Sequence, residues 1–171
     1  MYDSVPLASD ELMKKQSGRK AVIALTDGVD NGSKVTLTSA IESAQRADTL
    51  VYSILFADAE AYGGGGFGGG RYGGHRGGGV SPGRQGSRVN GKPILQQLSR
   101  ETGGGFFEVS KKQPIEKIYE QIEEELRNQY SLGYTSDHAA AAAGYRKIQI
   151  TTKQTGLAVQ ARDGYYASSK T

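Results

Sequence analysis

Two apolar runs in the first third of the chain have the pattern of buried β-strands. Residues 21–25 are all apolar, and residues 50–56 are apolar or aromatic apart from Ser53. Strands that are apolar on both faces are typical of parallel sheets covered by helices on both sides. We therefore predict two buried parallel strands at these positions.

Four segments repeat apolar residues at the three- and four-residue spacing of an amphipathic helix. The first begins near Val5, and the second begins at Thr36, whose hydroxyl is suited to capping a helix. The third and fourth have Pro93 and Pro114 in their first turns, where a helix needs no amide donor. The fourth is the clearest, with an apolar face formed by Ile115, Ile118, Tyr119, Ile122 and Leu126.

The remaining regular segments have the pattern of strands. Residues 106–109 and 130–134 are short apolar and aromatic runs. Residues 147–152 and 157–161 alternate apolar and polar side chains, which predicts a half-exposed antiparallel hairpin. Helices that alternate with strands before a final hairpin predict an α/β fold. We expect a Rossmann-like, mostly parallel sheet with flanking helices, plus the C-terminal antiparallel β-hairpin.

Composition adds one unusual segment to this picture. The chain has 171 residues, 25 of them glycine and none of them cysteine, so disulfides and thiolate metal ligands are excluded. Residues 63–92 hold most of the glycines, five basic side chains and no acidic one, although the net charge of the whole chain is only +3. Such a composition cannot form a packed core, and we predict a disordered Gly/Arg-rich loop insertion at about residues 60–91. No apolar run approaches the ~20 residues that span a bilayer.

The most specific chemistry follows the first apolar run. Thr26-Asp27-Gly28 places a carboxylate at the carboxyl end of a predicted parallel strand, where α/β proteins bind ligands. Further along, the chain contains Y-S-L-G-Y at 130–134 and A-R-D-G-Y-Y at 161–166. With these three motifs in this order, the chain resembles von Willebrand factor type A (VWA) domains, in particular a bacterial VWFA-related family first described in acidobacteria.

The resemblance implies a function as well as a fold. In VWA domains the aspartate of T-D-G, here Asp27, is an oxygen ligand of Mg²⁺ or a similar divalent cation. A protein ligand binds at the same place, often with a carboxylate that completes the metal shell. The nearby loop residues Thr26, Gly28, Asp30 and Asn31 would contribute to the ligand-binding surface, and the local pattern of Asp30 and Asn31 is also that of turn residues.

One part of the VWA pattern has no counterpart. The Asp-x-Ser-x-Ser motif, which follows the first VWA strand and supplies other metal ligands, is not present in this sequence. We interpret the chain as the carboxyl-terminal part of a longer protein, or as a chain whose sheet a second chain completes. Without the missing strands, the strand at 21–25 would have an open edge that invites pairing. For this chain alone we expect no cofactor. For the longer protein we expect Mg²⁺ and an extracytoplasmic location, periplasmic or secreted.

These interpretations divide the chain at residue 134. Residues 1–134 are predicted to form a truncated VWA-like domain that carries the glycine-rich insertion. Residues 135–171 are predicted to form the C-terminal β-hairpin extension. The expected function is a non-catalytic protein-binding or adhesion-type module whose protein ligand the sequence does not identify.

The glycine-rich insertion suggests an alternative function. Arginine and aromatic side chains separated by glycines resemble RGG-type RNA-binding segments, in which arginines contact phosphates and aromatics stack on bases. This alternative predicts salt-sensitive binding of RNA or single-stranded nucleic acid. The residues concerned are Arg71, Tyr72, Arg76, Arg84 and Arg88. The simpler interpretation is that the insertion is a surface loop that interrupts the domain. On this interpretation nucleic acid is not a partner of the protein.

Catalysis is not indicated by the sequence. The two histidines, His75 and His138, lie in the glycine-rich segment and beside an alanine run, away from the predicted strand ends where a Ser-His-Asp arrangement could be assembled. Residues 63–70 are not followed by Gly-Lys-Ser/Thr, which a phosphate-binding loop requires. We therefore expect no enzyme activity. A fragment without a function of its own stays open as a third interpretation.

Overall fold

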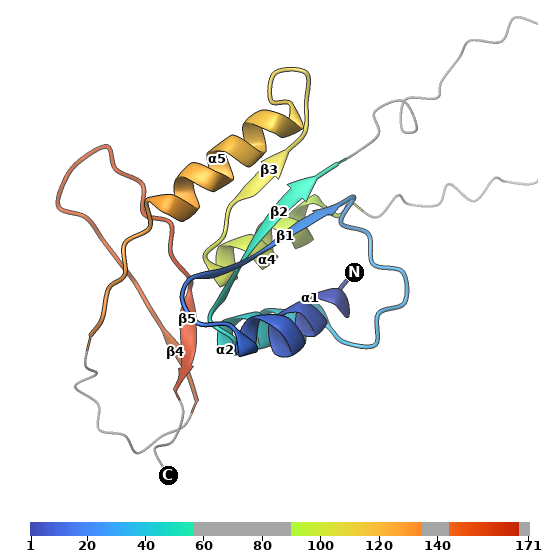
Figure 1. The fold of residues 1–171 in the computed structure, drawn as a ribbon, viewed down its shortest axis with the longest axis horizontal. Helices are drawn as coiled ribbons and strands as arrows, with labels where there is room; N and C mark the ends of the chain where they lie inside the picture. Colours follow the sequence, from blue (N-terminus) through green and yellow to red (C-terminus); the bar gives the residue numbers. More distant parts are fainter. Residues whose placement is uncertain (57–89, 135–143, 168–171) are drawn as a thin grey trace, which may run out of the picture.

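The computed structural model describes residues 1–56, 90–134 and 144–167. Its described part is a mixed α/β fold with a three-stranded parallel sheet and a separate antiparallel pair (Figure 1). The sheet has the order β1-β2-β3, with β1 at Lys20–Thr26, β2 at Thr49–Leu55 and β3 at Phe106–Glu108. The three predicted strands of the first 110 residues and their parallel pairing are therefore confirmed.

The helices before β2 also lie where the apolar spacing placed them. The N-terminal helix begins as α1 (Ser4–Pro6) and continues through the π-helical turns of η1 (Leu7–Leu12) and the 3-10 turn of η2 (Met13–Lys15). Helix α2 (Leu37–Arg46) is capped as predicted, because the Thr36 hydroxyl accepts a hydrogen bond from the N–H of Ser39 at 3.2 Å.

The two later helices begin at their prolines. Helix α4 (Lys92–Thr102) has proline in its first turn and ends at Gly103, whose φ of +87° is the left-handed conformation that glycine adopts readily. Helix α5 (Ile115–Arg127) follows Pro114, which occupies its N-cap position. In the part of the chain described, no helix has the length and apolar content needed to cross a membrane.

Helices cover the two faces of the sheet unequally. The N-terminal helix, α2 and α4 pack on one face, where the buried cluster is Val5, Ala40, Ile41, Ala44, Val51 and Leu98. Helix α5 packs on the other face, where the buried cluster is Tyr52, Ile54, Phe107, Ile118 and Ile122 (Figure 1). Helix α5 therefore lies over β2 and β3, and no other described element covers the part of β1 that carries Ile23 and Leu25 on that face.

Strand β1 is less buried than its sequence predicted. Ile23 is 39% exposed and Leu25 is 49% exposed, although the same alternation in β2 buries Tyr52 and Ile54 completely. The order of the strands explains the difference in burial, because β2 is the central strand and β1 is an edge strand. The prediction of an open edge is confirmed for the described residues, and the prediction of a fully buried strand is wrong.

The C-terminal hairpin forms at different residues from those predicted. Strands β4 (Gly144–Lys147) and β5 (Gly164–Ala167) pair antiparallel, whereas residues 148–163 between them are irregular. Among the described residues, the segment 148–161 pairs with no strand, so the prediction of strands at 148–152 and 157–161 is wrong, and of that prediction only Lys147 lies in a strand. The strand predicted at 130–134 is wrong for the same reason, and Tyr130 is 93% exposed. Arg46 of α2 lies 4.2 Å from the ring centre of Tyr166, which places the hairpin against α2.

Candidate ligand site at the carboxyl edge of the sheet

The carboxyl ends of the three parallel strands meet at one edge of the sheet. Asp27 directly follows β1, Phe56 follows β2 and Glu108 ends β3. Leu55 of β2 pairs with Thr26 on one side and with Glu108 on the other. Asp27 and Glu108 therefore lie at the same end of the sheet, separated by β2. The edge of an α/β sheet at which parallel strands end is the usual place for a ligand. The structure therefore places Thr26, Asp27 and the following loop at this edge.

The Thr26-Asp27-Gly28 turn is held by its own polar side chains. The N–H of Gly28 donates to the Thr26 hydroxyl at 3.2 Å, and the N–H of Val29 donates to Asp27 Oδ1 at 3.0 Å. Gly28 has a φ of +77°, and a Cβ at this position would lie 2.7 Å from the carbonyl oxygen of Gly91. Glycine is therefore required at position 28 for two reasons. One is the positive φ, and the other is the close contact with the residue before α4. The Asp27 side chain stays exposed to solvent.

Asp30 is engaged within the loop. Its Oδ1 accepts hydrogen bonds from the amine of Met1 at 2.9 Å and from the N–H of Tyr2 at 3.1 Å. The hydroxyl and the N–H of Ser33 donate to the same carboxylate. These hydrogen bonds favour the charged form and hold the pKa of Asp30 well below its usual range. The bond from the Ser33 hydroxyl has the largest effect. Asp30 thus acts as a turn residue here, and its neighbour Asn31 is exposed.

Asp3 anchors the far end of the same loop. Its carboxylate accepts the N–H groups of Lys34 at 2.9 Å and Val35 at 2.9 Å, and these backbone bonds lower the pKa of Asp3. About thirty residues separate donor and acceptor, so no local pattern in the sequence could have revealed this contact. Asp3 and Asp30 together hold residues 30–35 against the N-terminal helix.

Acid is expected to weaken the loop through these two carboxylates. Because the pKa of both Asp3 and Asp30 is lower in the folded chain, their stabilisation is complete above about pH 5, roughly one unit above the pKa of unfolded carboxylates. It is lost as the pH falls towards the folded pKa values. The midpoint of thermal unfolding should therefore drop between about pH 5 and about pH 3 more steeply for the wild type than for Asp30→Asn. Glu120→Gln, on the exposed side of α5, is the control, and equal slopes for Asp30→Asn and the wild type would contradict the assignment.

Lys92 and Glu108 add an ion pair to the carboxyl edge. Their Nζ and Oε2 atoms are 2.5 Å apart, and the side chains are 39% and 47% exposed. An exposed pair of this kind contributes under about 1 kcal/mol to stability. No local pattern in the sequence indicates this pair, because its formation depends on the side-by-side placement of β3 and α4. The lysine also leaves less net negative charge at this edge to attract a cation.

The metal-binding capacity of the described residues is small. Within residues 1–56, 90–134 and 144–167, no three acidic, histidine or cysteine side chains gather closely enough to hold a metal ion. Asp27 offers one carboxylate and Thr26 one hydroxyl, whereas Mg²⁺ takes octahedral coordination by oxygen. These two residues could fill only part of such a shell, with water or other donors in the remaining positions.

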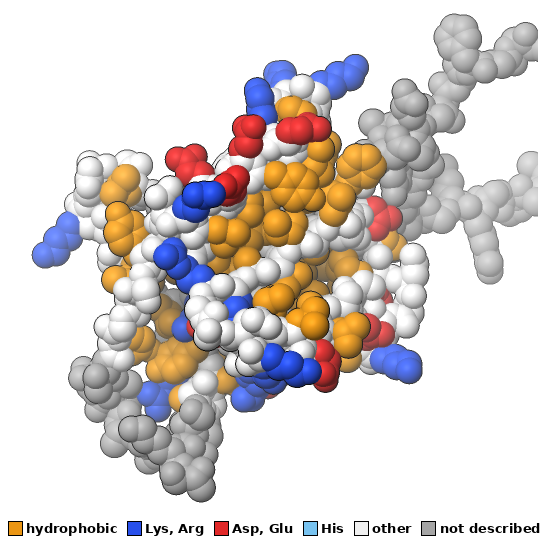
Figure 2. Space-filling view, in the orientation of Figure 1, with side chains coloured by type: hydrophobic (Ala, Val, Ile, Leu, Met, Phe, Trp, Pro, Cys, Tyr) orange, Lys and Arg blue, Asp and Glu red, His pale blue; other side chains and the backbone are white. Residues whose placement is uncertain are grey.

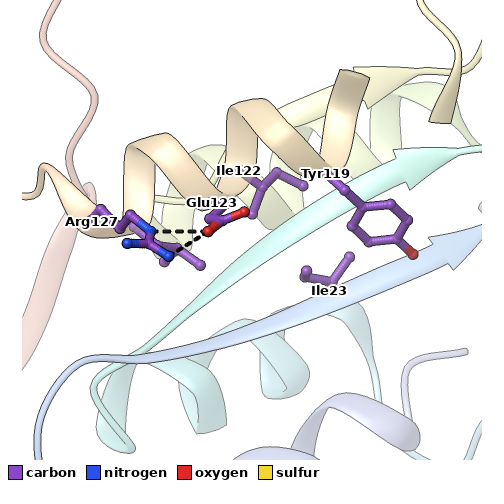
Figure 3. A pocket seen from close by; sticks show the side chains of 6 residues that line it. Ile23, Tyr119, Ile122, Glu123 and Arg127 are labelled. Atoms are coloured by element: carbon purple, nitrogen blue, oxygen red, sulfur yellow. Dashed lines mark hydrogen bonds and ion pairs between the residues drawn. The ribbon is translucent and has the colours of Figure 1, made fainter. Parts of the chain in front are cut away.

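A second surface feature lies away from this edge, between β1 and α5. It is an apolar hollow of about 400 Å³ whose walls come from one strand and one helix. Figure 3 shows Ile23 of β1 directed towards Tyr119 and Ile122 of α5, with the ion pair of Glu123 and Arg127 at one side. Leu126 completes the lining. Its polar lining is the Glu123–Arg127 ion pair, and the other lining side chains are apolar or aromatic.

Comparison with known proteins does not identify a family. No protein-family model matches the chain, and neither a curated protein nor a solved structure shows significant similarity to it. The resemblance to VWA domains therefore stays a prediction based on the three motifs. The geometry of the Thr26-Asp27-Gly28 turn is compatible with that prediction and does not distinguish it from other α/β folds.

Several predicted positions lie outside the described residues. They are the glycine-rich insertion apart from its last residues, both histidines, and the five residues of the nucleic-acid alternative: Arg71, Tyr72, Arg76, Arg84 and Arg88. The nucleic-acid alternative thus stays a prediction from sequence. What the structure adds is the position of the flanking residues, because Phe56 and Asn90 border the segment at the ends of β2 and α4.

Proposed function

We propose that this chain is part of a non-catalytic protein-binding module of the VWA type, and that its ligand binds at the carboxyl edge of the sheet. The observation that carries the proposal is the setting of Asp27. This exposed carboxylate follows a parallel strand directly, in a turn held by Thr26 and by the contact of Gly28 with Gly91. A rigid turn presents a carboxylate in one fixed direction, which a metal or ligand site requires.

The proposed binding chemistry uses a divalent cation as a bridge. One Asp27 oxygen and the Thr26 hydroxyl would supply hard oxygen donors for Mg²⁺. A single protein carboxylate leaves the cation with net positive charge, so an acidic side chain of a protein ligand would bind favourably on the open side. The other donors would come from further strands of a longer protein or from a second chain. Asn31 and the exposed loop around it would contact the ligand at the rim.

The site can be tested in the 171-residue chain with Mn²⁺, which takes the same oxygen ligands as Mg²⁺ and broadens nearby NMR signals. We expect the amide signals of Gly28, Val29 and Gly91 to weaken at Mn²⁺ concentrations that leave α5 unaffected. Asp27→Asn should remove this selectivity. Glu120→Gln, which neutralises an exposed acid in the middle of α5, should leave it intact.

A second experiment tests the dependence on missing strands. In a form of the protein extended at its amino end by an Asp-x-Ser-x-Ser strand, Mg²⁺ should raise the unfolding temperature, and Asp27→Ala should abolish that increase. Broadening by Mn²⁺ that is unchanged in Asp27→Asn would contradict the proposed site. The proposed mode of binding predicts that Asp27→Ala also weakens binding of an acidic protein ligand to the extended protein. Unchanged binding of such a ligand by Asp27→Ala would contradict it.

A further inference from the structure

The outer edge of β1 exposes backbone hydrogen-bonding groups. Within the described residues β1 pairs with β2 alone, and its other side has no partner strand. The N–H of Phe56 donates to the carbonyl of Thr26 at 3.1 Å, so Thr26 directs its backbone groups towards β2. Successive residues of a strand direct these groups to alternate sides. Ala21, Ile23 and Leu25 therefore direct theirs to the open edge.

This edge lacks the features that usually prevent strands from pairing. Edge strands are commonly protected by proline, by charged residues in the middle of the strand or by bulges. Between Lys20 and Thr26 there is no proline, and the one charged residue is Lys20 at the very start. The exposed side chain of Ile23 lines the hollow beside α5, and Leu25 is exposed on the same strand. Figure 2 shows hydrophobic side chains gathered in this region of the surface.

We propose that β1 pairs antiparallel with β1 of a second copy of this chain, about a twofold axis at Ile23. In this register Ile23 lies opposite the second copy's Ile23, and Ala21 lies opposite the second copy's Leu25. The three residues with outward backbone groups are then matched with one another, as the hydrogen-bonded pairs of an antiparallel ladder require. All seven residues of β1 overlap, and a shift by one residue would set outward groups against groups already bonded to β2.

Side chains and charges favour the same register. On the α5 face it places the large side chain of Leu25 beside the small side chain of Ala21, and on the opposite face it places Val22 beside Ala24. At the ends of the ladder, Arg19 of one copy lies opposite Asp27 of the other. Strand β1 is thus complementary to itself in reverse, with a basic start, an apolar middle and an acidic end.

The pairing would create one continuous sheet of two copies. Residues opposite each other in an antiparallel pair have their side chains on the same face, so both α5 helices would lie on one side of the sheet. The two hollows would then adjoin across the axis, and both Ile23 side chains would be shielded by the partner strand. The inference concerns only the edge of β1 and does not rest on metal binding by Asp27. In a longer protein whose own strand covers β1, this edge would be occupied.

Single cysteines provide a direct test, because the chain has none of its own. Directly opposed residues of a hydrogen-bonded antiparallel pair have Cα atoms about 5.5 Å apart, within the range that a disulfide spans. Ile23→Cys should therefore form a covalent dimer on mild oxidation. Leu25→Cys is the matched control, similarly exposed on the same strand and face. Its two copies would lie four residues apart along the ladder, about 13 Å, and should not cross-link.

Two further measurements complete the test. Ala21→Cys combined with Leu25→Cys should restore cross-linking, because these positions are opposed in the proposed register. Sedimentation velocity should give twice the monomer mass of 18.2 kDa for the wild type and the monomer mass for Ile23→Lys, which would place two like charges on the axis. A monomeric wild type at all concentrations would overturn the proposal. So would equally efficient cross-linking of Leu25→Cys and Ile23→Cys, and the cysteine result stands even if Ile23→Lys does not fold.

Discussion

Replacement of Ile122 by alanine is expected to lower the free energy of unfolding by about 3 kcal/mol. Ile122 is 1% exposed and packs with Tyr52, Ile54 and Phe107 beneath α5. The shorter side chain would leave a cavity under the helix that covers this face of the sheet, and the neighbouring side chains belong to β2 and β3, which cannot move inward to fill it. Chemical denaturation followed by circular dichroism measures the loss.

The chain offers a matched control for this substitution. Ile150 is 39% exposed and lies outside both buried clusters. Ile150→Ala should change the free energy of unfolding by no more than about 0.5 kcal/mol. Similar losses at positions 122 and 150 would mean that α5 is not packed on the sheet as described, and the hollow between α5 and β1 would lose its structural basis.

Replacement of Gly104 by alanine is expected to destabilise the fold by a similar amount, about 3 kcal/mol. A Cβ at position 104 would lie 2.1 Å from the carbonyl oxygen of Val51 and 3.0 Å from the nitrogen of Tyr52. These atoms belong to the backbone of the central strand β2, which is held by β1 on one side and β3 on the other. The added methyl group would therefore push the turn before β3 away from the sheet, where the carbonyl of Gly105 accepts the N–H of Ser53 at 2.9 Å.

Gly133 is the control for Gly104. A Cβ added at Gly133 meets no atom within 4 Å. Gly133→Ala should leave stability within about 0.5 kcal/mol of the wild type. If Gly104→Ala were equally harmless, the close approach of the turn to β2 would be incorrect, and so would the position of β3 next to β2. Thermal unfolding of the two variants side by side distinguishes these outcomes.

The two candidate surfaces of this protein share one strand. The turn after β1 presents Asp27 at the carboxyl edge, and the flank of β1 presents Ile23 to the open side of the sheet. In the proposed dimer Asp27 also lies opposite Arg19 of the second copy, whose guanidinium bonds to the carbonyls of Leu126 and Gln129 in its own chain. Asp27→Asn is therefore expected to abolish the proposed cation binding and to weaken the proposed dimer only slightly, because the ladder itself remains.

Local signals in the sequence are enough to locate the helices and the parallel strands. The boundaries of α2, α4 and α5 follow from Thr36, Pro93 and Pro114, and their inner faces follow from apolar spacing. These features are local, since a cap, a proline and a periodic stripe act within a few residues of the chain. The turn at Thr26-Asp27-Gly28 was predictable for the same reason, because its hydrogen bonds join residues two apart.

The surroundings of each segment depend on how the chain packs in three dimensions. The apolar pattern of residues 21–25 is the same for a central strand and an edge strand, and the sheet order alone makes Ile23 and Leu25 exposed. The alternation at 147–161 predicted two strands, but within the described residues 148–161 have no neighbouring strand, and a strand depends on packing against its neighbours. The contacts of Asp3 with Lys34 and of Gly28 with Gly91 join residues far apart in the chain, and the packing of the helices on the sheet creates them.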